Sequence, residues 1–306
     1  MSTPPFVDLP AGVHRTSILT KRGEFAALRA DPPDGSSPVS PALLVPGYSG
    51  SKEDFIALLE PIARAGRSVL AVDQRGQYDT PGPATPQAYT TEALGADVRA
   101  MIDVLGATAP VHLLGHSFGG LVTRAALLID SAGVASYTLL GSGPSKVVGL
   151  RQRHARLLVD VVSRFGPAVV APTMQRFESF RPGPKRPAEV LEFVRRRYEV
   201  SSPHALVAMA RSVLTEPDRV DELARVPIPT LVAFGENDDT WPPALQAEMA
   251  SRLGAACAVL ADAGHSPNAD VPTELAEVLV DFWHRAEARG RDAGTAEVFE
   301  QAQEVG

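Results

Sequence analysis

The chain has 306 residues, of which 44% are hydrophobic and 21% charged, a balance typical of a globular protein rather than a disordered one. Its formal net charge of −7 argues against nucleic acid as the main partner, because phosphate binding requires clustered Lys and Arg. With Cys257 as the single cysteine, no disulfide can form within the chain. There is no run of about 18 apolar residues and no basic region followed by an apolar one at the N-terminus, so we expect no membrane span and a cytoplasmic location.

The first part of the chain alternates between strand-like and helical patterns. Residues 15–31 predict a β-hairpin with Gly23 in its turn. Short apolar runs then alternate with segments of helical spacing, which indicates βαβ units and a parallel sheet. The expected strands are 42–47, 68–73 and 111–117, and the expected helices lie near 52–65 and 90–105.

The alternation continues to a last helix and gives about eight strands in all. Cys257 falls in the last apolar run, so we expect it to be buried in a strand. The expected strands of this part are 137–143, 229–235 and 257–264, and the expected helices lie near 119–130, 243–253 and 272–287.

Residues 145–226, which we term the insertion, interrupt this alternation. Strand patterns vanish there, and the amphipathic segments 150–165, 187–200 and 203–215 predict helices. The insertion has 15 Lys and Arg against 9 Asp and Glu, a net charge of +6, whereas the rest of the chain has 14 against 27, a net charge of −13. We therefore interpret it as a helical cap, or lid, on an α/β core formed by 1–144 and 227–288.

The remaining residues, 289–306, form a polar and acidic C-terminal tail with one possible short helix at 295–304.

A candidate nucleophile stands at a predicted strand-to-helix junction. Residues 115–119 read Gly-His-Ser-Phe-Gly directly after an apolar strand and before a helical pattern. A sharp turn of this kind needs small residues on both sides of the serine and exposes the hydroxyl at the carboxyl edge of the sheet. The motif therefore predicts Ser117 as a nucleophile.

A serine hydroxyl needs a base to take its proton, and a histidine is the usual one. Seven histidines are present, and His265 is the one that follows the last predicted strand, at the start of a loop on the same edge. His112 and His116 lie on the strand and in the turn of the nucleophile, where a productive bond to the hydroxyl is not expected. We predict His265 as the base.

The imidazole in turn needs a carboxylate that fixes its tautomer and stabilises its positive charge. The run Gly-Glu-Asn-Asp-Asp after the penultimate strand supplies candidates. We prefer Asp238 and keep Asp239 as the alternative. The order Ser117, Asp238, His265 is that of the α/β-hydrolases.

On these segments the chain resembles the α/β-hydrolase superfamily, with esterases and lipases that carry a lid as similar members. Over about residues 15–287 the resemblance implies an α/β-hydrolase fold, with a mostly parallel sheet, an N-terminal antiparallel hairpin and a helical cap. It also implies an oxyanion hole, which stabilises the negative oxygen formed during acyl transfer. Its donors would be the backbone N–H of Phe118 and, in the loop after the third strand, that of Tyr48.

This sequence departs from the family pattern at two places. Pro46 stands where the family usually has a histidine, which leaves the backbone donor intact but removes any role of that side chain. The segment 73–83 resembles the family's Asp-X-Arg-Gly turn, yet Gln77 and Tyr78 replace the usual small residue. We assign Asp73 and Arg75 a structural role in this turn.

Substrate contacts are harder to assign. The run 193–200, which contains three consecutive arginines, either steers an anionic substrate or is a solvated helix face, and we favour the second interpretation. No metal site and no cofactor are expected, because no third ligand accompanies His112 and His116. Apolar side chains of the insertion that either line an acyl pocket or pack the insertion on the core are Met174, Phe177, Phe180, Phe193 and Met209.

The sequence thus predicts a serine hydrolase that acts on a small-molecule carboxylic ester, lactone or thioester through an acyl-enzyme on Ser117. The same residues would serve an acyltransferase or cyclase if an alcohol or amine replaced water. The resemblance also leaves open perhydrolysis, hydrolysis of carbon–carbon bonds, proline-specific peptidase activity and a receptor-like member that binds ligand without turnover.

Overall fold

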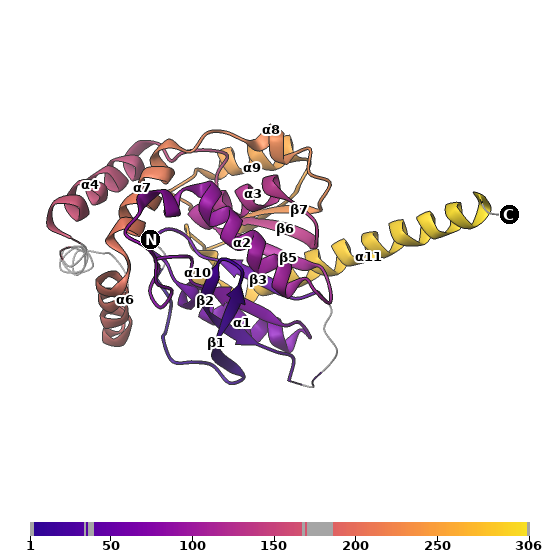
Figure 1. The fold of residues 1–306 in the computed structure, drawn as a ribbon, viewed down its shortest axis with the longest axis horizontal. Helices are drawn as coiled ribbons and strands as arrows, with labels where there is room; N and C mark the ends of the chain where they lie inside the picture. Colours follow the sequence, from indigo (N-terminus) through magenta and orange to yellow (C-terminus); the bar gives the residue numbers. More distant parts are fainter. Residues whose placement is uncertain (1–2, 34, 36–39, 167–168, 170–185, 305–306) are drawn as a thin grey trace.

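The computed structural model describes residues 3–33, 35, 40–166, 169 and 186–304. Its centre is an eight-stranded sheet whose strands run in the order β1-β2-β4-β3-β5-β6-β7-β8 (Figure 1). The strands are β1 (Val13–Thr20), β2 (Gly23–Ala30), β3 (Ala42–Val45), β4 (Val69–Val72), β5 (Val111–His116), β6 (Val134–Leu140), β7 (Thr230–Gly235) and β8 (Ala256–Leu260).

The predicted N-terminal hairpin is confirmed. Strand β1 pairs antiparallel with β2, from Val13 opposite Ala30 to Thr20 opposite Gly23. Strand β2 is also antiparallel to β4, and every later pairing in the sheet is parallel. The parallel part therefore brings the carboxyl ends of β3 to β8 to one edge, where ligand sites of open α/β sheets lie.

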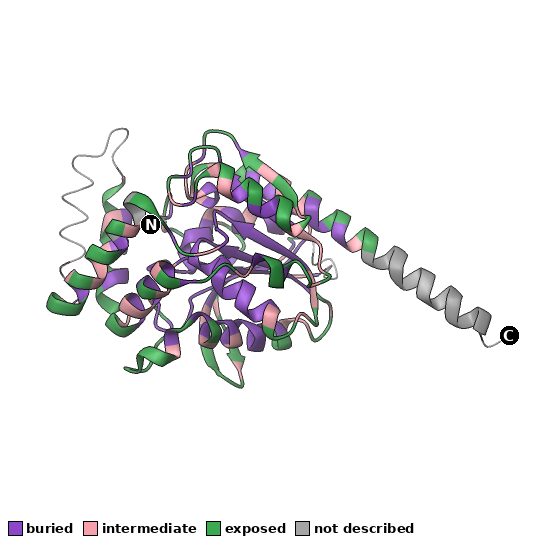
Figure 2. Cartoon of the chain, turned by 90° about the horizontal axis from the view of Figure 1, so that it is seen from above, coloured by how far each residue is buried: buried purple, intermediate pink, exposed green. Residues whose placement is uncertain are grey.

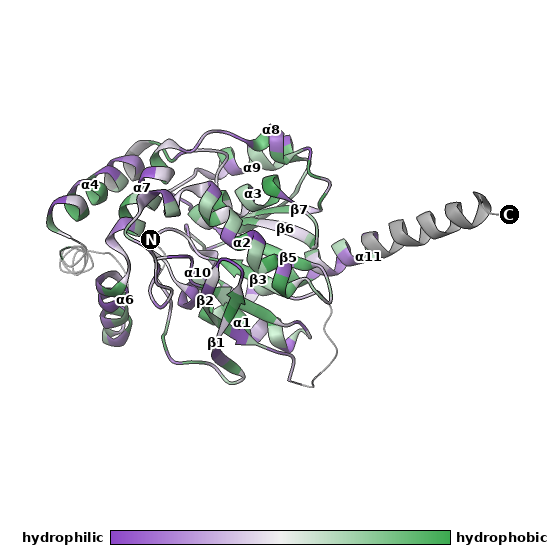
Figure 3. Cartoon of the chain, viewed as in Figure 1, coloured by the Kyte–Doolittle hydropathy of each residue, from purple (hydrophilic) through white to green (hydrophobic). Residues whose placement is uncertain are grey.

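Helices cover both faces of the sheet. Side chains of successive strand residues point to opposite faces, so Leu43 and Val45 join one apolar cluster while Ala42 and Leu44 join the other. One face carries α2 (Thr91–Leu105), α3 (Phe118–Ile129) and α9 (Pro243–Leu253), and the other carries α1 (Ile56–Arg64) and α11 (Pro272–Glu304). Figure 2 shows the buried strands between these layers, and in Figure 3 the hydrophobic colour concentrates on the strands and the flanking helices.

The insertion leaves the sheet after β6 and returns before β7. Its described helices are α4 (Gly149–Phe165), α6 (Ala188–Val200), α7 (Pro203–Thr215) and α8 (Val220–Leu223). Helices α4 and α6 lie at one end of the molecule, opposite the end from which α11 extends (Figure 1). Short helical segments that complete the fold are η1 (Lys52–Phe55), η2 (Pro86–Tyr89) and α10 (Pro267–Asp270).

Helix α11 is longer than the sequence pattern predicts. It runs without a break from Pro272 to Glu304, whereas we expected an end near residue 287 and a separate short helix at 295–304. Its first part is held to the sheet by buried Trp283 and by Glu287, whose carboxylate pairs with Arg67 at 2.7 Å and His112 at 3.0 Å. The amphipathic pattern thus ends before the backbone of the helix does.

The expectation that Cys257 is buried is wrong. It lies on β8 as predicted, but β8 is the edge strand of the sheet and the cysteine side chain is exposed. Because an edge strand has a neighbour on one side only, alternating apolar residues there do not guarantee burial. Within the described residues, no helix is long and apolar enough to cross a membrane.

Candidate functional site

The side chain of Ser117 stands at the sharp junction between β5 and α3. Its backbone has φ 56° and ψ −122°, a conformation that non-glycine residues rarely adopt. Gly119 allows the turn to form, because a Cβ atom there would lie 2.3 Å from the carbonyl oxygen of Val45 and 2.5 Å from that of Pro46. The strain is thus offset by close packing of the turn on the loop after β3, and the serine follows β5 at the carboxyl edge of the sheet.

The imidazole of His265 connects Ser117 with Asp238. Its Nε2 atom lies 2.9 Å from Ser117 Oγ, and its Nδ1 atom lies 3.1 and 3.2 Å from the two carboxylate oxygens of Asp238. Since an ionised carboxylate only accepts hydrogen bonds, Nδ1 carries the proton and Nε2 is left to accept the hydroxyl hydrogen. An imidazole so placed is able to take the proton of the serine hydroxyl.

Asp238 is buried, and two donors besides His265 hold its carboxylate. The backbone N–H of Thr240 donates to Oδ1 at 2.8 Å, and Gln246 Nε2 on α9 donates to Oδ2 at 2.9 Å. Burial alone would raise the pKa of Asp238, but the hydrogen bonds with His265, Thr240 and Gln246 and the charge of His265 together lower it. The neighbouring Asp239 is exposed, so the structure places Asp238 and not Asp239 against His265.

His116 supports the loop of His265 in a way that the sequence did not indicate. It is buried, and its Nε2 atom lies 2.9 Å from the carbonyl oxygen of His265, to which the ring must donate. Burial, and then the nearby imidazole of His265, lower the pKa of His116 to about 3. A neutral His116 therefore anchors the main chain at His265 without adding charge next to it.

The loop after β3 lies directly against the nucleophile. A Cβ atom at Gly47 would stand 3.0 Å from Ser117 Cβ and 3.4 Å from Ser117 Oγ, so a side chain at this position would crowd the serine. Gly47 consequently borders Ser117, and the N–H of Tyr48 belongs to the peptide that follows Gly47. The N–H of Phe118 is the first of α3, and the first N–H groups of a helix have no acceptor within it. Both predicted oxyanion donors thus come from backbone next to Ser117.

Two glutamines of the turn after β4 hold the carbonyl groups of this loop. Gln74 Nε2 donates to the carbonyl oxygen of Pro46 at 2.7 Å, and Gln77 Nε2 donates to that of Gly47 at 2.8 Å. Both side chains are buried. Sequence reasoning noted Gln77 only as a departure from the family pattern, because its partner is 30 residues away in the chain.

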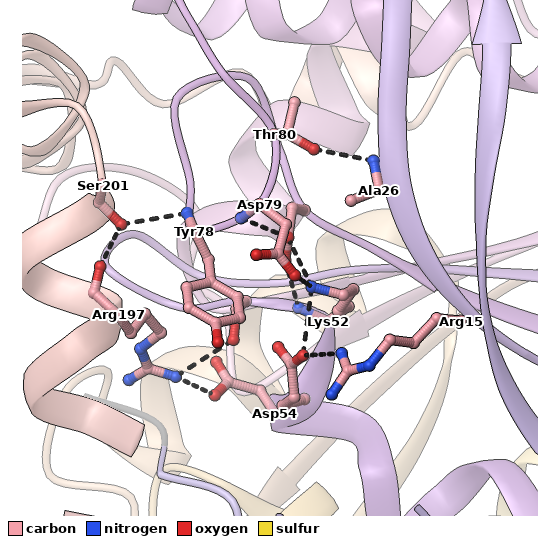
Figure 4. Close-up of polar contacts among 12 residues, drawn as sticks. Arg15, Ala26, Lys52, Asp54, Tyr78, Asp79, Thr80, Arg197 and Ser201 are labelled. Carbon is pink, nitrogen blue, oxygen red and sulfur yellow. Dashed lines mark hydrogen bonds and ion pairs between the residues drawn. The ribbon is translucent and has the colours of Figure 1, made fainter. Parts of the chain in front are cut away.

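A buried charged network connects the same loop, through Lys52, with the turn after β4 (Figure 4). Asp73 accepts from the backbone N–H of Lys52 at 2.7 Å and from Lys52 Nζ at 2.9 Å. Burial alone would lower the pKa of Lys52, but Asp73 and Glu53 raise it, so the ammonium stays charged. Arg75 is bound to both carboxylate oxygens of Asp97. These contacts are internal, in agreement with the structural role assigned to Asp73 and Arg75.

The insertion contacts the loops after β3 and β4 through buried groups. Arg197 on α6 pairs with Asp54 at 2.7 Å, with both side chains almost fully buried. The interpretation of the 193–200 run as a solvated face is therefore wrong for this arginine, which lies on the inner side of the helix. Arg195 does lie on the outer side, where it pairs with Glu192 and Glu199.

The apolar residues suggested for an acyl pocket fall into two groups. Phe193 packs edge-on against Tyr78 with ring centroids 5.3 Å apart, and Met209 is fully buried with its sulfur 3.9 Å from Gln77 Nε2. Both contacts join the insertion to the turn after β4, as packing requires. Met174, Phe177 and Phe180 lie outside the described residues, and a pocket role stays a prediction for all five.

A cavity with a volume of about 470 Å³ lies against the insertion in the described part of the chain. It is lined by one side of α7, including Val207 and Arg211, and by residues of η2 and α4. Among the described residues no group of three or more His, Cys, Asp or Glu could hold a metal ion.

Comparisons with known proteins identify the family of this chain. The sequence model of the alpha/beta hydrolase family matches residues 42–278, which include Ser117, Asp238 and His265. A proline iminopeptidase of Levilactobacillus brevis is 28% identical over 231 residues, covering 68% of this chain and 76% of the relative. A non-heme haloperoxidase of Rhodococcus erythropolis is 28% identical over 223 residues, covering 70% of this chain and 80% of the relative.

The similarity extends to solved structures. A thermophilic esterase from Thermogutta terrifontis has a TM-score of 0.71 and 26% identity, and the match covers 89% of this chain and 99% of the esterase.

Proposed function

Since the chain belongs to the alpha/beta hydrolase family, we propose that it is a serine hydrolase that cleaves a small carboxylic ester, lactone or thioester through an acyl-enzyme on Ser117. The observation that carries this proposal is the series of hydrogen bonds from Ser117 Oγ through His265 to Asp238. The family and its relatives indicate a hydrolase, and the similarity to an esterase over nearly its whole length supports the ester class.

The proposed reaction uses each of these groups in turn. His265 Nε2 takes the hydroxyl proton as Ser117 Oγ attacks the carbonyl carbon, and Asp238 stabilises the imidazolium that results. The negative oxygen of the tetrahedral intermediate accepts hydrogen bonds from the N–H groups of Phe118 and Tyr48. When the intermediate collapses, His265 gives its proton to the leaving alcohol or thiol. Water, deprotonated by His265, then attacks the acyl-enzyme and regenerates the free hydroxyl.

We further propose that the insertion selects the substrate. Its helix α6 contacts the loop after β3, which borders the serine, through Arg197, and its helix α7 contacts the turn after β4, which is bonded to that loop, through Met209. Binding sites of open α/β sheets lie beyond the carboxyl ends of the strands, which is where this insertion departs and returns. A cap in this position would limit water access and acyl-chain length while Ser117 and His265 supply chemistry common to many substrates.

The proposal is tested by a fluorophosphonate probe together with a substrate panel. The panel contains p-nitrophenyl esters, lactones, acyl thioesters and, because of the similarity to an iminopeptidase, proline p-nitroanilide. Labelling and turnover should both disappear in Ser117→Ala, by a factor of about 10⁴ or more, and persist in Ser251→Ala, a matched deletion of an exposed hydroxyl on α9.

Labelling without turnover of any substrate would indicate a binding protein. Turnover of the anilide alone would indicate a peptidase instead of an ester hydrolase.

A further inference from the structure

The side-chain amide of Gln77 has a fixed orientation beside the candidate oxyanion hole. Its Oε1 atom accepts from the backbone N–H of Gln74 at 3.0 Å, and a backbone N–H can only donate. The amide nitrogen must therefore be the atom that faces Gly47, where it donates to the carbonyl oxygen at 2.8 Å. The glutamine is 2% exposed, so water does not compete for this bond.

We propose that Gln77 is a positioning residue of the oxyanion hole, which acts by aiming the N–H of Tyr48. The peptide that carries this N–H also carries the carbonyl of Gly47. A trans peptide is planar, with its C=O and N–H pointing in opposite directions, and the described chain has no cis peptide. Holding the carbonyl toward Gln77 thus directs the N–H away from it. This inference rests on the proposed serine-hydrolase function.

The loop needs such support because its geometry is strained. Gly47 accepts a second, longer hydrogen bond from the N–H of Gly50 at 3.1 Å, which closes a turn with Ser49 at φ 57°. A non-glycine residue in this left-handed conformation raises the conformational free energy of the turn. Rotation of the peptides in the turn would relieve this strain. The bond from Gln77 opposes rotation of the peptide that carries the N–H of Tyr48.

The turn that carries Gln77 is itself held firmly (Figure 4). The N–H of Tyr78 donates to Ser201 Oγ at 3.1 Å, and the N–H of Asp79 donates to the buried carboxylate of Asp73 at 3.1 Å. Thr80 Oγ1 accepts from the N–H of Ala26 on β2 at 2.9 Å. The turn is thus anchored to the sheet and to the end of α6, and Gln77 bonds the loop beside the nucleophile to this anchored turn.

Two substitutions separate this role from simple packing. Gln77→Met keeps the size of the side chain and removes the donor. Gln77→Glu keeps the acceptor for Gln74 but, when ionised, has no hydrogen for Gly47. Thr91→Val is the matched control, because it removes a buried hydrogen bond, from Thr91 Oγ1 to Glu216 at 2.8 Å, that belongs neither to this turn nor to the loop after β3.

The primary measurement is steady-state hydrolysis of the best ester of the panel. Both Gln77 variants should lower kcat by about 10-fold or more with little change in KM, somewhat less than the loss of an oxyanion donor itself. A trifluoromethyl ketone matched to the acyl chain, which adds to the serine and places an oxyanion in the hole, should lose affinity by the same factor. The corresponding methyl ketone, which forms no such adduct to a comparable extent, should bind as before.

A pH profile provides a readout that a packing role would not change. In Gln77→Glu the introduced carboxyl group, once protonated, would be able to donate its hydrogen to Gly47. The kcat ratio of Gln77→Glu to wild type should therefore rise as the pH is lowered from about 8 to about 5.5, whereas the ratio for Gln77→Met should stay flat.

Unchanged kcat in both Gln77 variants, equal losses for the two ketones, or an equal loss in Thr91→Val would overturn the inference while leaving the hydrolase proposal intact. A wild-type protein that neither turns over an ester nor labels at Ser117 would overturn both.

Discussion

The burial of His116 has a measurable consequence for stability at acidic pH. In the folded protein its ring is enclosed, donates to the carbonyl of His265 and has a pKa of about 3. In the unfolded chain the same ring returns to its ordinary pKa of 6.5. Between these two pKa values the unfolded state binds a proton at His116 and the folded state does not, so lowering the pH favours unfolding.

The sign and size follow from the two pKa values. The folded pKa is below the unfolded one, so the contribution of a neutral His116 is fully present above pH 6.5 and is lost progressively as the pH falls toward 3. At pH 5 the unfolded ring is almost entirely protonated and the folded ring is not, which corresponds to a loss of about 2 kcal/mol relative to pH 7.

The comparison of wild type with His116→Gln isolates the contribution of His116 to the pH dependence of the free energy of unfolding, since glutamine retains a donor but does not titrate. Urea unfolding at pH 7 and pH 5 can be followed by the fluorescence of Trp241 and Trp283, which are both buried. Wild type should lose about 2 kcal/mol more than the variant between the two pH values. Equal pH dependence in the two proteins would refute the argument.

Two further substitutions test other parts of the site. Asp238→Asn should lower kcat by about 10⁴-fold while the exposed Asp239→Asn changes it little, and the reverse ranking in ester hydrolysis would transfer the role to Asp239. Arg197→Met leaves the carboxylate of Asp54 buried and unpaired, so urea unfolding should show a loss of about 3 to 5 kcal/mol. Adding Asp54→Leu should restore most of the lost stability. A double variant no more stable than Arg197→Met would contradict a buried ion pair between Arg197 and Asp54.

The sequence predicted those features that depend on order along the chain. Strand and helix periodicity located the eight strands, and Ser117, His265 and Asp238 were found because each lies in the segment that follows a strand. Parallel strands bring such positions to one edge whatever the details of packing, so the three residues could be linked before any contact was known. Their catalytic roles, like those of Tyr48 and Phe118, stay predictions.

The features that were missed depend on which neighbour a residue meets in space. Cys257 has the pattern of a buried strand, but strand order along the sheet, which local periodicity does not contain, places it at an edge. Arg197 is one of three adjacent arginines, and only the position of α6 relative to Asp54 distinguishes it from the other two. Gln77 and Gln246 give no local signal, since each acts through a group that the fold brings to it.

Asp54 contacts both the insertion and the loop of His265, so a chimeric protein that carries the insertion of a relative would have to preserve these contacts. Its carboxylate binds Arg197 of the insertion, 143 residues away, and its carbonyl accepts from Asn268, three residues beyond His265 and 214 residues away. The insertion is thus not interchangeable with the helical segment of a relative, even where the junctions at β6 and β7 fit. A grafted segment must supply a cation at the position of Arg197 or be accompanied by a neutral residue at position 54. Otherwise the carboxylate of Asp54 would be left buried and unpaired beside the loop of His265.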